Sequence, residues 1–382
     1  MVSDTSSSKR IARDLPTPVR ALLVVGLLYL FLVGVTLLES GISAMGEGFT
    51  QGLLDGVSNP LAGLFAGILF TVLVQSSSVS TSAIVGLVGA GTIPLELAVP
   101  MIMGANIGTT VTSTLASFGS VRRPDEFRRG FGAATVHDMF NVIAVTVLLP
   151  LELLTGFLTN SAVWLTGILR GTDVAEVGKS PIRTAVKVPV DAITGAFESV
   201  ITVGAVLGVI FLALGLTLIF LALGFITKNM RKLVQGSVER AMNRAIGKGG
   251  GLVGILVGIL VTFAVQSSTI TTSILVPLVA AGVLTLKNAY PITLGANVGT
   301  TITALLASLA VLRPEGLTIA LVHTLFNLTA IILVYPVRRI REVPVRLAEA
   351  MAGLVVKRRP LAIAYSFGLF VAIPLVGVFA LN

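Results

Sequence analysis

The sequence of 382 residues contains no cysteine, only two histidines and 12% charged residues. Without cysteine the chain can form no disulfide, thiolate metal site or cysteine nucleophile. Two histidines are too few for a dedicated histidine-based metal site with its usual partners. A soluble domain carries about 25% charged residues, whereas this chain is 54% hydrophobic with a mean hydropathy of +0.96. So little charge cannot cover a soluble surface, and the composition therefore predicts an integral membrane protein.

The net charge is +9, and a soluble protein this basic would suggest a nucleic-acid partner. The sequence shows no basic stripe with interleaved aromatic residues, so we expect no nucleic-acid binding. Lys and Arg instead gather in short segments between apolar runs, which is typical of cytoplasmic loops under the positive-inside rule. Paired intramembrane carboxylates and the HExxH, GxSxG and Walker-type motifs are also missing. We therefore expect neither an enzyme nor an ATP-driven pump, and no cofactor.

The apolar runs predict an all-α polytopic membrane protein. Residues 1–20 are expected to form a cytoplasmic N-terminal tail. The run that follows is about 18 residues long, longer than the 7–15 of a signal peptide, so we predict a retained first helix. About 20 apolar residues cross the hydrocarbon core, and the runs that approach this length are 21–38, 99–118, 131–149, 200–226, 291–311, 317–335 and the final helix, 361–381.

Two pairs of shorter apolar runs predict re-entrant helical hairpins, over 58–91 and 249–282. In the first, Pro60–Val74 would reach about 22 Å at 1.5 Å per residue, which is short of a ~30 Å core. It ends in the polar tip Gln75–Ser78, and a second short run follows. Such a polar turn is tolerated within a membrane only where it faces protein or a water-filled cavity.

Two of the long runs carry the motif GANxGTT, at 104–110 within 99–118 and at 295–301 within 291–311. Two glycines and an asparagine destabilise the interior of a helix. We therefore expect each run to be a broken helix with free backbone carbonyls near the middle of the membrane.

These motifs recur in the same order, which predicts an internal duplication. VQSSSVSTS and GANIGTT return as VQSSTITTS and GANVGTT at an offset of 191, and VHDMFN returns as VHTLFN at an offset of 186. We assign repeat 1 to 21–170 and repeat 2 to 199–382, joined by an extracytoplasmic linker at 171–198. The basic segments place the two hairpins on opposite sides of the membrane. Inverted repeats with broken helices are typical of secondary transporters.

The polar tips supply the candidate site, because hydroxyls bind an oxyanion as donors and Na⁺ as acceptors. Free N–H groups at helix N-termini suit an anion, and free carbonyls at helix C-termini suit Na⁺. Ser and Thr in membrane helices often only pack or bond the carbonyl four residues back, but matched tips in both halves favour a binding role. The candidate residues are Gln75, Ser76, Ser77, Ser78, Thr81, Ser82, Asn106, Gln266, Ser267, Ser268, Thr269, Thr272, Ser273 and Asn297.

A histidine precedes an asparagine by one helical turn in both halves, as His137 with Asn141 and as His323 with Asn327, so each pair shares a helix face. These residues could support the site or respond to protons. We prefer the interpretation that each histidine is neutral and bonded to a neighbouring helix.

Asp138 is an acidic residue inside a predicted span, and such residues are functional candidates by default. Two interpretations remain open for it. It could be a cation ligand, or it could pair with Arg128 or Arg129 near the membrane face.

The quoted motifs, together with EFRRGFGAATVHDMFN, resemble type II sodium-dependent phosphate cotransporters, and in particular a prokaryotic-type member. The resemblance covers about 58–152 and 250–335. It implies uptake of inorganic phosphate across the cell membrane with Na⁺ as the coupling ion, in a protein embedded in the lipid bilayer, and it leaves a homodimer open. It also implies phosphate and Na⁺ sites at Gln75–Ser78 and Gln266–Thr269, extending to Asn106, Thr109, Thr110, Asn297, Thr300 and Thr301.

The family is similar to elevator-type transporters, in which a moving domain holds both hairpins, with 151–169 and 338–356 as surface helices. The working hypothesis is therefore a Na⁺/phosphate symporter that works by alternating access. One alternative is a Na⁺- or H⁺-coupled carrier of another oxyanion or of a dicarboxylate, although neither tip contains the arginine that carboxylate recognition often uses. The other is an ion channel lined by the polar tips, which stoichiometric coupling would exclude.

Overall fold

Helices make up the fold of the computed structural model, which describes residues 15–46, 48, 51–52, 59–170, 181–247, 251–311 and 313–381. Within these ranges the backbone contains no strand. Four parts of the sequence-based expectations lie outside the described residues: the tail at 1–14, the start of the linker at 171–180, and the hairpin starts at 58 and 249–250.

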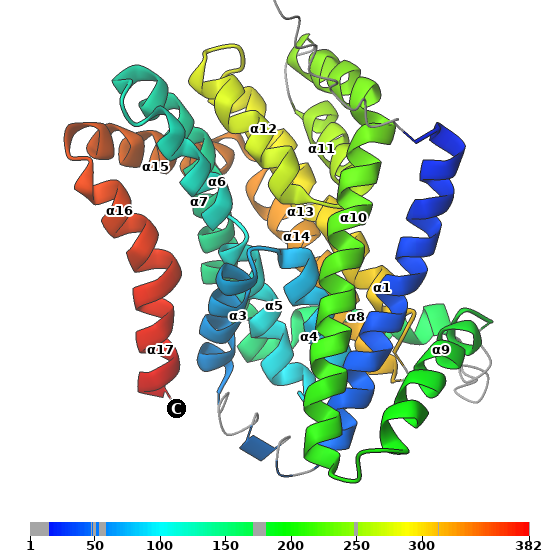
Figure 1. The fold of residues 1–382 in the computed structure, drawn as a ribbon. Helices are drawn as coiled ribbons and strands as arrows, with labels where there is room; N and C mark the ends of the chain where they lie inside the picture. The colour runs from blue at the N-terminus through cyan, green and yellow to red at the C-terminus, as the bar shows by residue number, and fades with distance from the viewer. Residues whose placement is uncertain are drawn as a thin grey trace, which may run out of the picture.

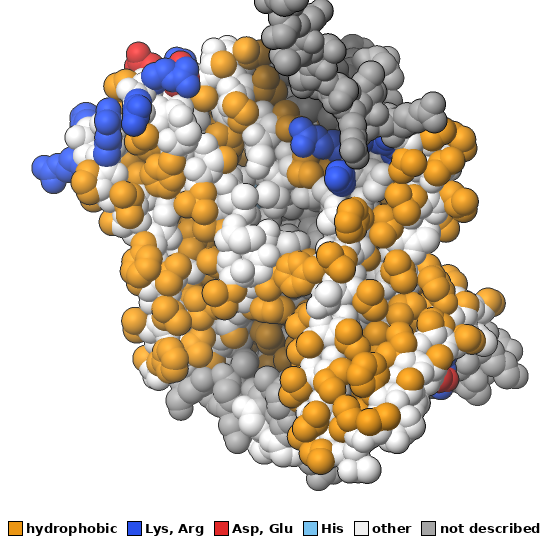
Figure 2. Space-filling view, viewed as in Figure 1, with side chains coloured by type: hydrophobic (Ala, Val, Ile, Leu, Met, Phe, Trp, Pro, Cys, Tyr) orange, Lys and Arg blue, Asp and Glu red, His pale blue; other side chains and the backbone are white. Residues whose placement is uncertain are grey.

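In the described chain, five helical segments are long and apolar enough to cross a membrane. The shortest has 21 residues, or about 32 Å at 1.5 Å per residue, which spans a ~30 Å core. Figure 2 shows apolar side chains over the middle and lower part of the visible face, with Lys and Arg gathered toward the upper end. The protein is therefore a multi-pass membrane protein. The segments are α1 (Thr17–Met45), α7 (Pro124–Thr155), Gly204–Leu233 of α10 (Gly204–Gly247), α14 (Pro314–Val334), and Pro360–Leu381.

Several of these helices extend beyond their predicted ends. The C-terminal segment combines α16 (Pro360–Phe367) and α17 (Ile373–Leu381) around a π-helical turn, η3 (Gly368–Ala372). α10 continues past the apolar run 200–226 to Gly247, because the basic stretch that follows contains good helix formers and no proline.

The two predicted hairpins are present as pairs of short helices. α3 (Pro60–Val74) and α4 (Ser77–Gly89) form the first, and α11 (Leu252–Val265) and α12 (Ser268–Ala280) form the second. In Figure 1 the first pair lies in the lower half of the bundle and the second in the upper half, so the tips meet near its middle. That the pairs are re-entrant in a membrane stays a prediction.

The GANxGTT motifs do not break their helices as expected. α13 (Leu286–Ser308) continues through its motif, so the predicted broken helix over 291–311 is wrong. In the first half α5 (Leu95–Gly108) and α6 (Val111–Ser117) meet at Thr109–Thr110, and η1 (Phe118–Ser120) follows. The dihedrals of both threonines stay helical, and the Thr110 N–H donates to the Ile107 carbonyl. The expected break within 99–118 is therefore one tightened turn.

The motif glycines serve helix packing instead. A Cβ on Gly104 would lie 2.0 Å from the Leu64 carbonyl oxygen of α3, and one on Gly295 would lie 2.0 Å from the Ile255 carbonyl oxygen of α11. Small residues spaced by four let helix backbones approach closely within membranes. This close packing of the two backbones offsets the ~1 kcal/mol that glycine costs in a helix.

Three amphipathic helices accompany the bundle: α8 (Phe157–Arg170), α9 (Pro181–Glu198) and α15 (Arg338–Lys357). α9 makes the expected linker helical from Pro181 onward. α15 buries Val345, Ala348, Ala352 and Val355, spaced by three or four residues, and packs against α7. α9 and α15 lie at opposite ends of the bundle in Figure 1.

α1 and α10 pack along each other through glycines. A Cβ on Gly215 of α10 would lie 2.7 Å from the Gly34 carbonyl oxygen, and one on Gly41 of α1 would lie 2.6 Å from the Leu212 nitrogen. Backbones this close leave no room for larger side chains. The pairing holds α10 beside the hairpin tips.

Candidate functional site

Each hairpin turns at a glutamine with an uncommon backbone conformation. Gln75 and Gln266 both have φ of 56°, and elsewhere in the described ranges positive φ occurs only at glycine. A residue with a Cβ adopts this left-handed conformation at a cost of roughly 1–2 kcal/mol. The conformation ends α3 and α11 abruptly, and α4 and α12 each begin two residues after the glutamine.

The glutamine side chains hold these turns in place. Gln75 Nε2 donates to the Val72 carbonyl at 2.6 Å, and its Oε1 accepts from Thr112 Oγ1 at 3.1 Å. Gln266 makes the matched contacts, at 2.7 Å with the Phe263 carbonyl and 3.1 Å with Thr303 Oγ1. Each tip is therefore tied to the helix segment that follows a GANxGTT motif.

A buried pair of hydroxyls closes each hairpin below its tip. Thr71 and Ser80 lie 2.7 Å apart across the first hairpin, and Thr262 and Thr271 lie 2.8 Å apart across the second. All four residues occupy matched positions of the two halves. The duplication seen in the sequence is therefore also a duplication of hydrogen-bond geometry.

The second helix of each hairpin starts at its tip. Ser76 Oγ accepts from the Val79 N–H, and Ser267 Oγ accepts from the Ile270 N–H. The other N–H groups of a first helical turn have no partner within the helix, and the helix dipole adds positive potential there. Both tips thus offer donors to an anion.

Three serine hydroxyls at the tips remain unengaged. The side chains of Ser77, Ser78 and Ser268 are 6%, 6% and 2% exposed, and their hydroxyls enter none of the side-chain hydrogen bonds found in the described chain. A hydroxyl without a partner in the protein is available to a ligand as donor or acceptor.

A cavity of about 240 Å³ joins the two tips. Ser76 and Ser78 line it from the first hairpin, and Gln266 and Ser267 from the second. The other predicted site residues are not part of its lining. α10 contributes Phe220, Leu223, Gly224 and Thr227 to the lining. The sequence did not predict these residues, because α10 carries no repeated motif. The one available signal was Thr227, a hydroxyl at the end of an apolar run.

Most other predicted site hydroxyls donate to carbonyls of their own helix. These bonds are 2.6–3.0 Å long, as the structural interpretation of membrane Ser and Thr expects. A hydroxyl bonded in this way keeps its lone pairs and can still accept or coordinate a cation. They are Thr81, Ser82, Thr109, Thr110, Thr272, Thr300 and Thr301.

Two predicted site residues lie on α12, and one residue that the sequence did not predict lies on α6. Thr269 and Ser273 lie on α12 and are half-buried. Ser113 Oγ lies 2.8 Å from Thr272 Oγ1, which links the first half to the second hairpin. The sequence did not mark Ser113 as a candidate, because the matched position in the second half is Ala304 and the hydroxyl is therefore not repeated.

Buried amides and imidazoles connect the halves at the centre of the bundle. His137 Nε2 is hydrogen-bonded to Asn297 Oδ1, and Asn297 Nδ2 donates to Asn141 Oδ1 at 2.8 Å. Asn141 Nδ2 donates to the Asn106 carbonyl at 2.7 Å, and Asn327 Nδ2 donates to Asn106 Oδ1 at 3.2 Å. His137 is thus bonded to a neighbouring helix, as preferred from the sequence.

The same cluster ends at His323, whose backbone carbonyl accepts from Asn327 Nδ2 at 3.0 Å. The His323 imidazole makes no hydrogen bond in the described chain, so the preferred interpretation of a histidine bonded to a neighbouring helix is wrong for this residue. His323 and Asn327 are 1% and 0% exposed. The asparagines of both GANxGTT motifs therefore take part in a polar cluster between the halves rather than in the cavity lining.

Asp138 is fully buried on α7. Its Oδ2 accepts from Thr114 Oγ1 at 3.2 Å and from the Tyr365 hydroxyl at 2.9 Å, while Oδ1 has no partner in the described chain. Tyr365 comes from α16 and was missed, because no sequence motif connects the C-terminal segment to the repeats. An unpaired buried carboxyl oxygen is a candidate cation ligand.

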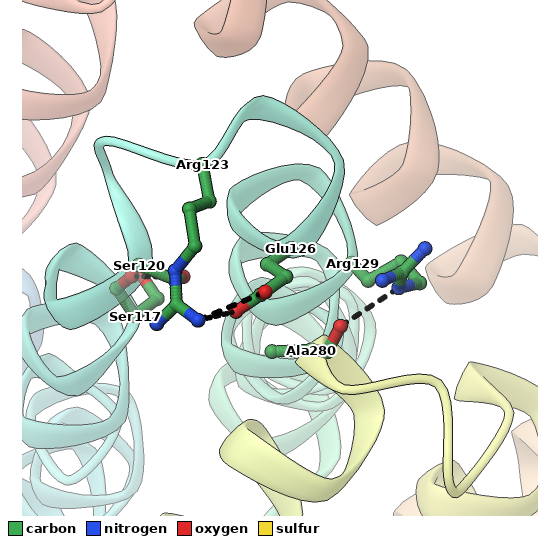
Figure 3. A network of polar contacts seen from close by, with 6 residues as sticks. All are labelled: Ser117, Ser120, Arg123, Glu126, Arg129 and Ala280. Atoms are coloured by element: carbon green, nitrogen blue, oxygen red, sulfur yellow. Dashed lines mark hydrogen bonds and ion pairs between the residues drawn. The ribbon is translucent and has the colours of Figure 1, made fainter.

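The alternative pairing of Asp138 with the arginine-rich loop is wrong. Figure 3 shows Arg129 donating to the Ala280 carbonyl at the end of α12, at 2.8 Å, and Arg123 paired with Glu126. Arg128 and Arg129 both line a separate cavity at the bundle end. Arg123 and Arg129 therefore stabilise helix ends, and neither Arg128 nor Arg129 pairs with Asp138.

The oxygen donors at the site are hydroxyls, amides and carbonyls, with one carboxyl. Where the chain is described, no cluster of three His, Asp or Glu residues is present. Neutral oxygens at helix ends suit Na⁺ as a coupling ion.

A family model described as Na⁺/Pi-cotransporter matches residues 30–160 and 218–356. The sodium-dependent phosphate transport protein 2A of Rattus norvegicus is 33% identical over 92% of this chain, and 2A of Oryctolagus cuniculus is 33% identical over 96%. Protein 2B of Homo sapiens is 32% identical over 95%. The alignments cover 66%, 68% and 65% of these relatives, so the chain spans about two thirds of their length. No solved structure matches the chain significantly.

Proposed function

The chain belongs to the Na⁺/Pi-cotransporter family, and on this premise we propose that it is a Na⁺-coupled symporter of inorganic phosphate in the cell membrane. The observation that carries the proposal is the cavity between the tips. Residues at two duplicated, polar helix starts line this one cavity. A carrier with two related halves needs such a shared site.

Phosphate binding would use the donors of the tips. The first turns of α4 and α12 present N–H groups and positive dipole ends. The unengaged hydroxyls of Ser77, Ser78 and Ser268 add neutral donors around them. Because neither tip contains Lys or Arg, the Na⁺ bound beside the phosphate would supply the compensating positive charge.

Sodium binding would use the acceptors. The hydroxyls of Thr81 and Ser82 already give their protons to helix carbonyls, so toward the site they can only accept. The C-terminal carbonyls of α3 and α11 add further oxygens beside the tips. The free Oδ1 of Asp138 is a further ligand, and through Thr114 it adjoins α6, which is tied to both hairpins.

Alternating access would follow from the arrangement of the halves. One hairpin opens toward each end of the bundle in Figure 1, and both tips close on the same cavity. If the halves form inverted repeats, exchanging their conformations exposes the cavity to one side and then the other. An elevator-like displacement of both hairpins past α1 and α10 would do the same.

Uptake of radiolabelled phosphate into proteoliposomes tests the function. We expect concentrative, saturable uptake under an inward Na⁺ gradient and none under a matched K⁺ gradient. Sulfate, arsenate and dicarboxylates as competitors identify another substrate, and uptake that never saturates identifies a channel. Failure of folded protein to take up phosphate with Na⁺ contradicts the proposal.

Serine variants test the site itself. Ser77→Ala and Ser268→Ala should each weaken Na⁺-driven uptake about tenfold or more, because a hydrogen bond to a charged ligand contributes ~1.5–3 kcal/mol. Ser161→Ala is the matched control, since this exposed hydroxyl of α8 bonds only its own helix. Unchanged uptake in both tip variants would place the site elsewhere.

A further inference from the structure

A second polar cavity, of about 220 Å³, lies far from the tips, where α11 and α13 begin and α14 ends. Lys287, Asn288 and Tyr290 line it from α13, and Arg341 and Glu342 line it from α15. Tyr335, just after α14, and Gly251, just before α11, complete the polar part of the wall. No residue of either tip is part of this lining.

Two cations face the cavity. Lys287 is exposed and Arg341 is half-buried, with its guanidinium 5.0 Å from the centre of the Tyr335 ring. The only carboxylate in the lining, Glu342, is bound by Arg346 at 2.6 Å and by Arg338 at 3.2 Å. These hydrogen bonds hold the pKa of Glu342 below its ordinary value. Glu342 therefore stays ionised but is already neutralised, and the cavity keeps a positive balance.

Tyr290 adds an independent sign of a ligand. Its side chain is 2% exposed, and its hydroxyl has no partner in the part of the chain that the structure describes. Buried hydroxyls are almost always hydrogen-bonded. A bound acceptor in the cavity would satisfy this group.

The N-terminus of α11, whose dipole adds positive potential, adjoins the same cavity at Gly251. Its N-cap is Gly251, which offers no side chain to the first turn. The matched helix of the first half, α3, is capped by Asn59 Oδ1, which accepts from the Leu61 and Ala62 N–H groups at 3.0 Å each. Of these two matched helices, the one without a side-chain cap is the one beside Lys287 and Arg341.

The duplication supplies an internal comparison at the other positions. Where the second half has Lys287, Asn288 and Tyr290, the first half has Glu96, Leu97 and Val99. A role in the shared fold would not require this change from acidic and apolar residues to basic and polar ones. The difference is specific to one end of the molecule.

We propose that this cavity binds a phosphate group, carried either by an anionic phospholipid headgroup or by free inorganic phosphate. Two cations, a phenolic hydroxyl and a helix N-terminus match an anion with several oxygens. The cavity also adjoins the amphipathic helix α15, where Ile340 and Val343 are 43% and 42% exposed. Basic pockets at the ends of membrane helices commonly receive lipid headgroups. The proposal does not depend on the transport site.

Native mass spectrometry of the purified protein tests the lipid source, with phosphatidylglycerol and phosphatidylcholine added separately in Na⁺-free buffer. We expect retention of phosphatidylglycerol, reduced about fivefold for each cation removed in Lys287→Gln/Arg341→Gln. Tyr290→Phe should weaken it with the fold intact, and the charge-conserving Lys287→Arg/Arg341→Lys should retain it. Arg339→Gln/Arg358→Gln is the matched control, because both arginines are exposed and neither lines the cavity.

Equilibrium binding of radiolabelled inorganic phosphate, again without Na⁺, tests the free anion. Binding that is lost in the cavity variant and kept in the control supports the proposal with phosphate itself as occupant. Loss of phosphatidylglycerol retention in the cavity variant supports it with the lipid. If neither probe binds, or if both bind the cavity variant as well as the control, the proposal is wrong.

Discussion

The tip glutamines hold a backbone conformation that glycine adopts more readily. Both half-sites nevertheless carry glutamine, because its amide satisfies a carbonyl of the first helix and a threonine of a neighbouring helix at once. The side-chain contacts offset the backbone cost. At this scale the structure explains a residue that the sequence marked only as part of a polar tip.

Substitutions at Gln266 separate the two contributions. Gln266→Ala loses both side-chain contacts and keeps the left-handed backbone, whereas Gln266→Gly loses the contacts but relieves the backbone. We expect the glycine variant to be more stable than the alanine variant by roughly 1 kcal/mol, and both to transport more slowly than the parent. Thermal unfolding in detergent measures the first effect and phosphate uptake the second. An alanine variant as stable as the glycine variant would contradict this account of the turn.

Asp138 offers a test of the sodium site. Asp138→Asn keeps the shape of the side chain but replaces a carboxyl oxygen by an amide, so we expect the Na⁺ concentration for half-maximal uptake to rise about tenfold. Asp125→Asn removes an acidic group at the start of the same helix and should leave Na⁺ dependence unchanged. Equal Na⁺ dependence of Asp138→Asn and the parent would exclude Asp138 as a ligand.

At the scale of helices, the GANxGTT motifs show how composition misleads about a break. Glycine has low helix propensity in isolation, but Gly104 and Gly295 lie against backbone carbonyls of α3 and α11. Packing overrides propensity in both places. The pairs of short helices, in contrast, were predicted correctly, because a polar tip between two short apolar runs has few alternative structures within a membrane.

Alanine substitutions distinguish glycines that lie against a neighbouring helix backbone from glycines with open space around them. Gly295→Ala would place a Cβ 2.0 Å from a carbonyl oxygen, so we expect destabilisation of about 1–3 kcal/mol or more. Gly353→Ala is the matched control within a helix, because nothing lies within 4 Å of its Cβ position, and it should be neutral or stabilising. Melting temperatures in detergent measure both. Similar melting temperatures for the two variants would argue against the packing role.

At the scale of the whole molecule, two similar halves meet at one cavity and one polar cluster. The duplicated hydrogen bonds give each hairpin the same internal structure, while His137 and Asn297 connect one half to the other. The proposed alternating access would follow from opposite orientations of the halves in the membrane.

The absence of cysteine allows this orientation to be measured directly. Leu61 and Leu252 occupy matched positions at the starts of α3 and α11 and are 42% and 73% exposed. In single-cysteine variants, an impermeant maleimide should label Leu61→Cys from outside the cell and Leu252→Cys only from inside. Ser199→Cys and Arg358→Cys serve as outer and inner markers. Labelling of both hairpin variants from one side would contradict inverted repeats.

The sequence by itself determined the membrane class, the duplication, the pairs of short helices and the family. These follow from local properties: the length of apolar runs, the residues at their ends, and the recurrence of motifs such as QSS and GANxGTT. The serines of the tips were also recognised as candidates from sequence, because hydroxyls at the junction of two short helices have few other reasons to be there.

Only the tertiary structure decided how these parts meet. Phe220 and Thr227 of α10 line the cavity, and the Tyr365 hydroxyl of α16 donates to Asp138, although no local pattern connects these residues to the repeats. The same holds for α13, which stays helical because a carbonyl of α11 lies against Gly295. In each case the deciding partner is distant in sequence, and packing between helices determines which local preference prevails.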